Sequence, residues 1–181
     1  MALLQGQVTA QRPGEVQPRS LQPGSPVFAE DTIQTQASAK VQMLLIDATE
    51  LSLGERATMT LSQLVFAPER HTHRGVVSIA QGIFRAVTKT VLPQTRFEIR
   101  TGTAVAAVRG TQWLGEVTPE STAIVVIQGE VAVSHSDPSI SGTTSLSRGL
   151  GSEVHGRTPP TPAKKWAEAR VFTLLRATAL P

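Results

Sequence analysis

The histidines of this chain are the side chains whose spacing could most directly do chemistry. His71 and His73 are separated by one residue, so in a strand their rings would share a face and could hold a divalent metal ion. A metal site usually needs three or four ligands. Glu69 is near, but His135 and His155 are far away in the sequence. We therefore interpret this segment as a solvated loop and predict no metal site.

The acidic residues give a second set of candidates. Asp31 and Asp47 could form an acid–base pair, or could bind calcium together with Glu30. Each Asp, however, occupies a turn position where its carboxylate can bond the nearby backbone, so we predict structural roles for both. The Ser, His and Asp of segment 134–137 are sequence neighbours that nothing arranges as a relay. We predict no catalytic or cofactor-binding residue and expect a protein that is not an enzyme. Convergence of His71, His73 and a carboxylate in one cleft would instead indicate a hydrolase.

The triplet Arg109, Gly110 and Thr111 could bind an anion through its backbone and guanidinium group. We predict instead that it fixes a corner of the chain, with Arg109 paired to a carboxylate such as Asp47 or Glu98.

Composition excludes several classes of protein. The 181 residues are 40% apolar and only 17% charged, with a net charge of +3 and no cysteine. Disulfides and thiolate zinc sites are therefore impossible, and no basic cluster favours nucleic-acid binding. No apolar run approaches the ~18 residues of a transmembrane helix. The first residues, MALLQGQV, do not read as a signal peptide, so we expect either a cytoplasmic protein or one whose leader has been removed.

The elements that must position these residues are short strands. Alternation of apolar and polar residues over 39–53 predicts a hairpin that reverses at Asp47 and Ala48. Pro23 and Gly24 predict a tight turn, and further turns are expected at Gly82, Gly110 and Gly129. Turn signals recur every eight to twelve residues without βαβ alternation. This pattern predicts an all-β fold of stacked short antiparallel hairpins, as a sandwich, barrel or solenoid.

The C-terminal part has a different composition. Thr158–Pro162 is rich in proline and predicts a stiff linker. Ala163–Ala177 is the one stretch with helical periodicity, which predicts an amphipathic helix. We therefore expect a β domain over 1–157, a linker over 158–162 and a helical tail over 163–181. The helix could pack back on the β domain, or it could contact a partner or a membrane surface through Trp166, Phe172 and Leu175.

The chain carries a series of short motifs in a fixed order. In chain order they are Gly6-x-Val8, Leu21-x-Pro-Gly24-x-x-Val27-x-x-x-Asp31-x-Ile33-x-Thr35, Ala39-x-Val41, Asp47-x-Thr49-x-Leu51-x-Leu53, Gly82-x-Phe84, Phe97-x-Ile99-x-Thr101, Ala104, Arg109-Gly110-Thr111, Val126–Val133 around Gly129, and Leu146–Gly149. This series resembles the FecR domain family. The likeness covers about residues 5–155. One departure is Ala48, because the family usually has Asp-Gly at this hairpin tip and Ala tolerates a positive φ poorly.

The resemblance implies an extracytoplasmic all-β module of bacterial signalling and cell-envelope proteins. The family's best-known members are membrane-spanning anti-sigma regulators of iron uptake, with a sigma-binding domain, a transmembrane helix and a receptor-docking domain. None of these is recognisable here, so the anti-sigma role is not carried over. The expected structural positions of the motif are Gly24, Asp31, Thr35, Asp47, Gly82, Thr101, Arg109, Gly110, Thr111 and Gly129.

The resulting hypothesis is a non-enzymatic periplasmic or cell-surface module, without a cofactor, that binds another envelope protein in signalling or assembly. Strand edges and the C-terminal helix are the expected contact surfaces, for a different partner or for a second copy of the chain. The alternative is a carbohydrate-binding envelope module. That function needs exposed aromatic side chains, for which Trp113 and Trp166 are the candidates.

Overall fold

The computed structural model describes residues 2–67, 72–88 and 94–180. Within these ranges the side chains of 66, 67, 72, 73, 94–96 and 109 are not described. The strands are β1 (Ala2–Gln5), β2 (Val8–Gln11), β3 (Arg19–Ser20), β4 (Thr32–Thr35), β5 (Lys40–Leu44), β6 (Glu50–Leu53), β7 (Thr58–Ala67), β8 (Thr72–Val87), β9 (Gln94–Arg100), β10 (Ala104–Val117), β11 (Ser121–His135), β12 (Thr143–Leu146), β13 (Leu150–His155) and β14 (Lys164–Lys165). One helix, α1 (Glu168–Thr178), follows them. The predicted all-β class with a C-terminal helix is confirmed.

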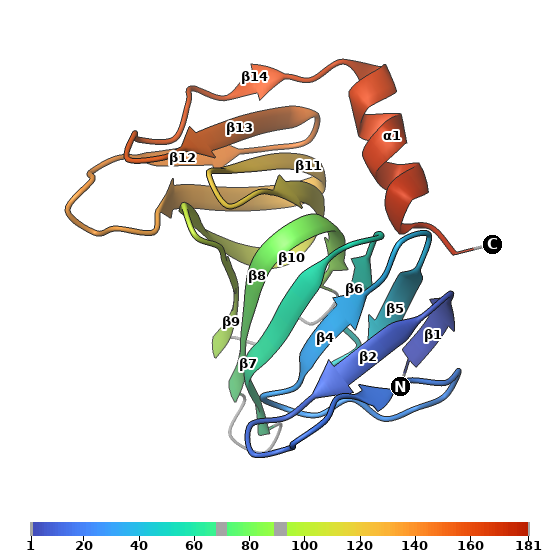
Figure 1. The fold of residues 1–181 in the computed structure, drawn as a ribbon. Helices are drawn as coiled ribbons and strands as arrows, with labels where there is room; N and C mark the ends of the chain where they lie inside the picture. The colour runs from blue at the N-terminus through green and yellow to red at the C-terminus, as the bar shows by residue number, and fades with distance from the viewer. Residues whose placement is uncertain (1, 68–71, 89–93, 181) are drawn as a thin grey trace.

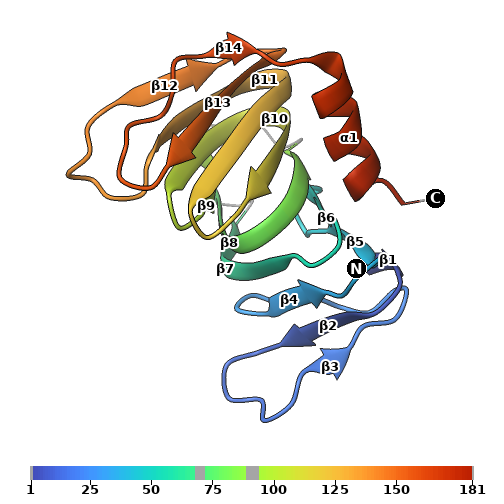
Figure 2. The same ribbon diagram turned by 45° about the horizontal axis from the view of Figure 1, so that its top comes forward.

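The strands form two layers that share three long strands (Figures 1 and 2). In the first layer the order is β12, β11, β10, β9, β8, β7, β4, β2 and β3. In the second it is β14, β13, β11, β10, β8, β6, β5 and β1. Strands β8, β10 and β11 contribute one half to each layer. Between the strands that the structure describes, all pairings are antiparallel except that of β8 with β9.

The main core lies between the two layers and is built by period-two alternation. In β5, Val41 and Met43 point inward and are fully buried, and in β6 Leu51 and Leu53 face them. The predicted hairpin over 39–53 is confirmed by these two strands and their register. The core also contains the aromatic rings of Trp113 and Phe84, which pack edge to face with their ring centroids 5.1 Å apart.

The prediction of chain-reversing turns at three glycines is wrong. Gly82, Gly110 and Gly129 have φ values of +107°, +59° and +86°, but they lie inside the continuous strands β8, β10 and β11. Each glycine lies at or beside the point where its strand changes partners: β8 from β7 to β10, β10 from β9 to β8, and β11 from β13 to β12. A positive φ bends and twists a strand without ending it, as in a β-bulge. The strands therefore cross between layers instead of folding back as hairpins.

Helix α1 covers the outer face of the second layer (Figure 1). Its buried Leu174 packs with Leu114, Val125 and Trp166 in a second, smaller core. The expectation of a helix over 163–177 is wrong at its beginning, because Lys164 and the residue after it form β14 instead. Pairing of β14 with β13 overrides local helix propensity there.

The proline-rich segment 158–162 lies against β13. The Thr161 amide donates to the carbonyl of Glu153 (2.9 Å), and the Ser152 hydroxyl donates to the carbonyl of Thr161 (2.7 Å). Pro160 is buried. The segment thus brings Trp166 and α1 back onto the sheet. Among the residues that the structure describes, no helix is long and apolar enough to cross a membrane.

Candidate interaction groove

Asp31, the central acid of the motif, is a buried structural residue. Its carboxylate has no exposed surface and is ion-paired with Arg12 (3.3 Å) and with Arg19. It also accepts a hydrogen bond from the backbone amide of Phe28 (2.8 Å). Burial by itself would raise the pKa of Asp31, but the hydrogen bonds from Arg19 and the Phe28 amide outweigh it and lower this pKa. The carboxylate therefore joins the loop between β2 and β3 to the corner before β4.

Asp47 is also engaged with its own turn. Its carboxylate accepts hydrogen bonds from the Thr49 amide (3.1 Å) and the Thr49 hydroxyl. The amide of Ala48 donates to the carbonyl of Leu45, and Ala48 has a φ of +61°. Residues 45–48 form a β-turn that ends in a left-handed residue, a conformation that favours glycine. Ala48 thus adopts this conformation at the cost of backbone strain.

The motif threonines bond backbone groups at strand ends and at the bends of the long strands. The Thr35 hydroxyl donates to the carbonyl of Gly54 (2.7 Å), and the Thr111 hydroxyl donates to the carbonyl of Glu130 (2.9 Å). The oxygen of Thr101 accepts from backbone amides in its own turn. These bonds satisfy backbone groups at corners.

The arrangement of segment 134–137 does not form a relay. Nδ1 of His135 accepts a hydrogen bond from the backbone amide of Asp137 (2.9 Å), and Nε2 lies 2.7 Å from the carbonyl oxygen of Gly156. Both ring nitrogens are therefore engaged by backbone groups. The Asp137 carboxylate instead accepts from the Ser139 hydroxyl and amide, which lower its pKa.

Some chemical candidates cannot be placed. Glu69 and His71 lie outside the described residues, as do the side chains of His73 and Arg109. Of the carboxylates considered for Arg109, Glu98 is buried and ion-paired with Arg100 (2.9 Å). Among the side chains that the structure describes, no three of His, Asp or Glu gather as a metal site would require.

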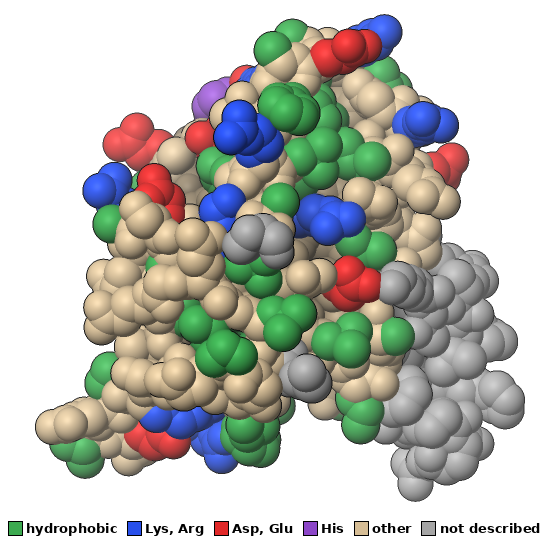
Figure 3. Space-filling model, turned by 90° about the vertical axis from the view of Figure 1, so that its right-hand side faces the viewer, with side chains coloured by type: hydrophobic (Ala, Val, Ile, Leu, Met, Phe, Trp, Pro, Cys, Tyr) green, Lys and Arg blue, Asp and Glu red, His purple; other side chains and the backbone are tan. Residues whose placement is uncertain are grey.

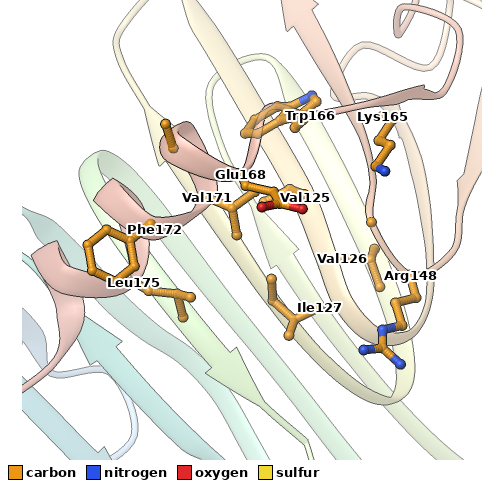
Figure 4. A pocket seen from close by; sticks show the side chains of 12 residues that line it. Val125, Val126, Ile127, Arg148, Lys165, Trp166, Glu168, Val171, Phe172 and Leu175 are labelled. Atoms are coloured by element: carbon orange, nitrogen blue, oxygen red, sulfur yellow. The ribbon is translucent and has the colours of Figure 1, made fainter.

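An open groove of about 630 Å³ runs along one side of α1 (Figure 4). Its walls are α1, the middle of β11, which passes beneath the helix, the turn between β12 and β13, and the end of β14. The lining residues are Val125, Val126, Ile127, Arg148, Gly149, Lys165, Trp166, Glu168, Ala169, Val171, Phe172 and Leu175. All three side chains expected to contact a partner line this groove, although Trp166 is only 5% exposed and forms part of the floor.

The two flanks of α1 differ. On one flank Arg170 holds the helix to the sheet, donating to the carboxylate of Glu153 (2.6 Å) and lying 3.8 Å from that of Glu116. The guanidinium also stacks on the ring of Trp166, with Cζ 3.8 Å from the ring centroid. The hydrogen bond from Arg170 is the main cause that lowers the pKa of Glu153. At the end of the helix, Lys40 donates to the carbonyl of Arg176 (2.7 Å) and to that of Ala179, the residue after the helix (2.9 Å).

The other flank is open. Val171 and Phe172 lie three and four residues after Glu168 and four and three residues before Leu175, so the four side chains form a stripe along this side. Phe172 is 60% exposed. Figure 3, which views the molecule from the side of α1, shows hydrophobic side chains grouped in the upper part of that face with Lys and Arg side chains beside them.

The groove is polarised along its length. Arg148 and Lys165 lie at the end nearest the β12–β13 turn and β14, while Phe172 and Leu175 lie at the other end (Figure 4). The N-terminal end of α1 points to the cationic end and has no side-chain cap, so its partial positive charge adds there. With Glu168, the ionised side chains of the lining sum to two positive and one negative charge, or +1.

Sequence reasoning found the helical wall of the groove and missed its floor. Val125 and Ile127 belong to the run Ala123–Ile127, which is apolar at every position. A continuous apolar run indicates a strand covered on both faces, whereas alternation indicates one covered face. The run therefore indicates that a further element covers the second face of β11, and in the structure that element is α1. Arg148 carries no comparable signal, because it is one of many exposed cations in loops.

The chain belongs to the FecR protein family, whose model matches residues 31–132. No curated protein matches the chain. Two crystal structures of a proposed anti-sigma factor from Parabacteroides distasonis have a similar fold, each with 18% sequence identity and a TM-score of 0.64. The match covers 80% of this chain but only 64% and 63% of those chains. The chain thus spans less than two thirds of the length of these relatives.

Proposed function

We propose that this chain is a non-enzymatic module of the cell envelope that acts in signalling or assembly by binding another protein through the groove beside α1. Membership of the FecR family supports the envelope signalling role. A periplasmic or cell-surface location is part of the same proposal.

The observation that carries the proposal is the open apolar flank of α1. Burial of apolar surface contributes about 25 cal/mol per Å², so a half-exposed ring beside a hollow is a surface that gains free energy when covered. Phe172 projects from the helix, and Ile127 and Leu175 are only partly buried around it. Protein interfaces are centred on such aromatic anchors beside a pocket.

Carbohydrate binding has less support. Trp113 is fully buried and Trp166 is 5% exposed, so neither offers an open ring face for a sugar. The exposed aromatic side chains among the described residues are Phe28 and Phe172. Arg12 and Arg19 already stack over Phe28, with Cζ 4.3 and 5.7 Å from the ring centroid.

The test compares two substitutions of exposed apolar residues. Phe172→Glu places a charge in the groove, whereas Val16→Glu places one on the loop between β2 and β3, where Val16 is 94% exposed. We expect Phe172→Glu to abolish co-purification of proteins with the tagged chain from envelope extract, with an unchanged melting temperature. Val16→Glu should behave as the wild type. Equal co-purification by all three chains would contradict the proposal.

A further inference from the structure

We infer that the groove beside α1 receives an amphipathic helix of the partner, with carboxylates directed at Arg148 and Lys165. This inference rests on the proposed function and adds the chemical class of the occupant.

The backbone of the groove argues against an extended occupant. A bound strand needs free backbone groups at a sheet edge. Here Val125 is paired with Leu114 on one side and with Gly151 on the other, and the carbonyl of Val126 accepts from the amide of Gly149 (2.8 Å). The rest of the lining comes from α1, whose backbone groups bond within the helix, from the turn before β13, and from β14, which is a sheet edge of only two residues. An extended segment could pair with those two residues at most and would leave its other polar backbone groups unsatisfied, whereas a helix satisfies them internally.

The shape of the wall suits a second helix. Val171 and Phe172 lie four and three residues before Leu175 and form a ridge with it, and such ridges pack into the grooves between the side chains of a neighbouring helix. Ile127 lies on the floor beside this ridge (Figure 4). An occupant with apolar residues at the same spacing would contact both the ridge and the floor, and would extend the layer that α1 begins over the outer face of the sheet.

Charge sets the composition of the occupant. Arg148 and Lys165 are exposed, and neither side chain is paired with a carboxylate within the described part of the chain. The uncapped end of α1 adds positive potential at the same end of the groove. Glu168 opposes this potential, so its removal should strengthen binding of an acidic helix. Complementary charges at the rim increase the association rate and select the partner.

The experiment uses a photo-crosslinker in the full chain. A benzophenone amino acid replaces Phe172, and the matched control carries it at Val16. After irradiation in native envelope extract, the crosslinked segment is identified by mass spectrometry and synthesised as a peptide. We expect a segment with apolar residues at three and four residue steps and at least two Asp or Glu side chains.

Binding of that peptide then tests the charges. Arg148→Glu combined with Lys165→Glu should weaken binding at least tenfold, and Glu168→Gln should strengthen it. Arg157→Glu, a control at an exposed arginine outside the groove lining, should leave it unchanged. A crosslinked segment that alternates with period two, a basic segment, or an affinity insensitive to the double substitution would overturn the inference while leaving the proposed function. Equal crosslinking at 172 and 16 would overturn both.

Discussion

At the scale of single residues, the side chains of the motif make corner bonds in this chain. Asp31, Asp47 and the threonines bind backbone amides and carbonyls or neighbouring arginines. A structural role for the two Asp residues stays a prediction, and it is based on side-chain chemistry: an Asp in a turn has its acceptor close to the amides it binds. The partners of Asp31, in contrast, come from 12 and 19 residues away.

Asp31 should make the stability of the protein depend on pH. Its pKa is lower in the folded state than the ~3.9 of an unfolded Asp, so its ionised form stabilises the fold above that value and this stabilisation is lost as the pH falls through the folded pKa. We expect Asp31→Asn to lower the free energy of unfolding by roughly 1–3 kcal/mol at pH 7, because the partly exposed Arg12 and Arg19 lose a charged acceptor. The difference from the wild type should shrink below about pH 4.

Urea denaturation at pH 2 to 7 measures this dependence. Glu120→Gln changes an exposed carboxylate and serves as the control, with no comparable effect expected. A constant difference between Asp31→Asn and the wild type across this range would show that the ionisation of Asp31 does not stabilise the fold.

Ala48 should be a position where glycine stabilises the protein. Its φ of +61° is unfavourable for a residue with a Cβ, by roughly 1–2 kcal/mol. We therefore expect Ala48→Gly to raise the free energy of unfolding by about 1 kcal/mol, measured by chemical denaturation. Ala37→Gly is the matched control, because Ala37 is also an exposed turn residue but does not have a positive φ. That control should lose stability, and equal effects of both substitutions would contradict the prediction.

At the scale of elements, the long strands depend on glycines at their bends. A Cβ on Gly82 would lie 2.3 Å from Cβ of Ala57, and the φ of +107° is itself unfavourable for other residues. We expect Gly82→Ala to lower the free energy of unfolding by about 3 kcal/mol or more. Gly102→Ala is the control, because the nearest atom to its added Cβ is 3.8 Å away and its φ is not in the left-handed range.

Thermal and urea denaturation of both variants would measure the difference. Should the two substitutions cost the same, the bend at Gly82 would not depend on glycine.

The same bends show where sequence reasoning fails. A glycine with positive φ between apolar runs fits a tight hairpin turn, but it fits equally a bend in a strand that continues. What decides is which strands lie beside each half, and that pairing is made by residues distant in sequence. The beginning of α1 is a similar case, because Lys164 and its neighbour have adequate helix propensity and yet pair with β13.

At the scale of the whole molecule, the C-terminal segment completes a third layer. The expected division at residue 157 stays a prediction, and a chain ending at 157 tests it. Removal of 158–181 would uncover Leu114, Ala123 and Val125, which α1 and Trp166 cover. Since each large buried side chain contributes about 1.5–3 kcal/mol, we expect the truncated chain to lose at least about 3 kcal/mol.

Urea denaturation and binding of a hydrophobic dye would report the loss of stability and the newly exposed surface. An unchanged denaturation midpoint without dye binding would show instead that the tail is separate from the β domain.

The sharing of β8, β10 and β11 by both layers has a mechanical consequence. Force applied to one layer is carried into the other along the covalent backbone of these strands. The two layers therefore cannot separate or slide unless the hydrogen bonds of all three shared strands break. Strand β11 illustrates this, since it forms the groove floor at Val125 and ends in the other layer at His135. A module that receives tension or torque from an attached partner would transmit it across its full thickness as one rigid body.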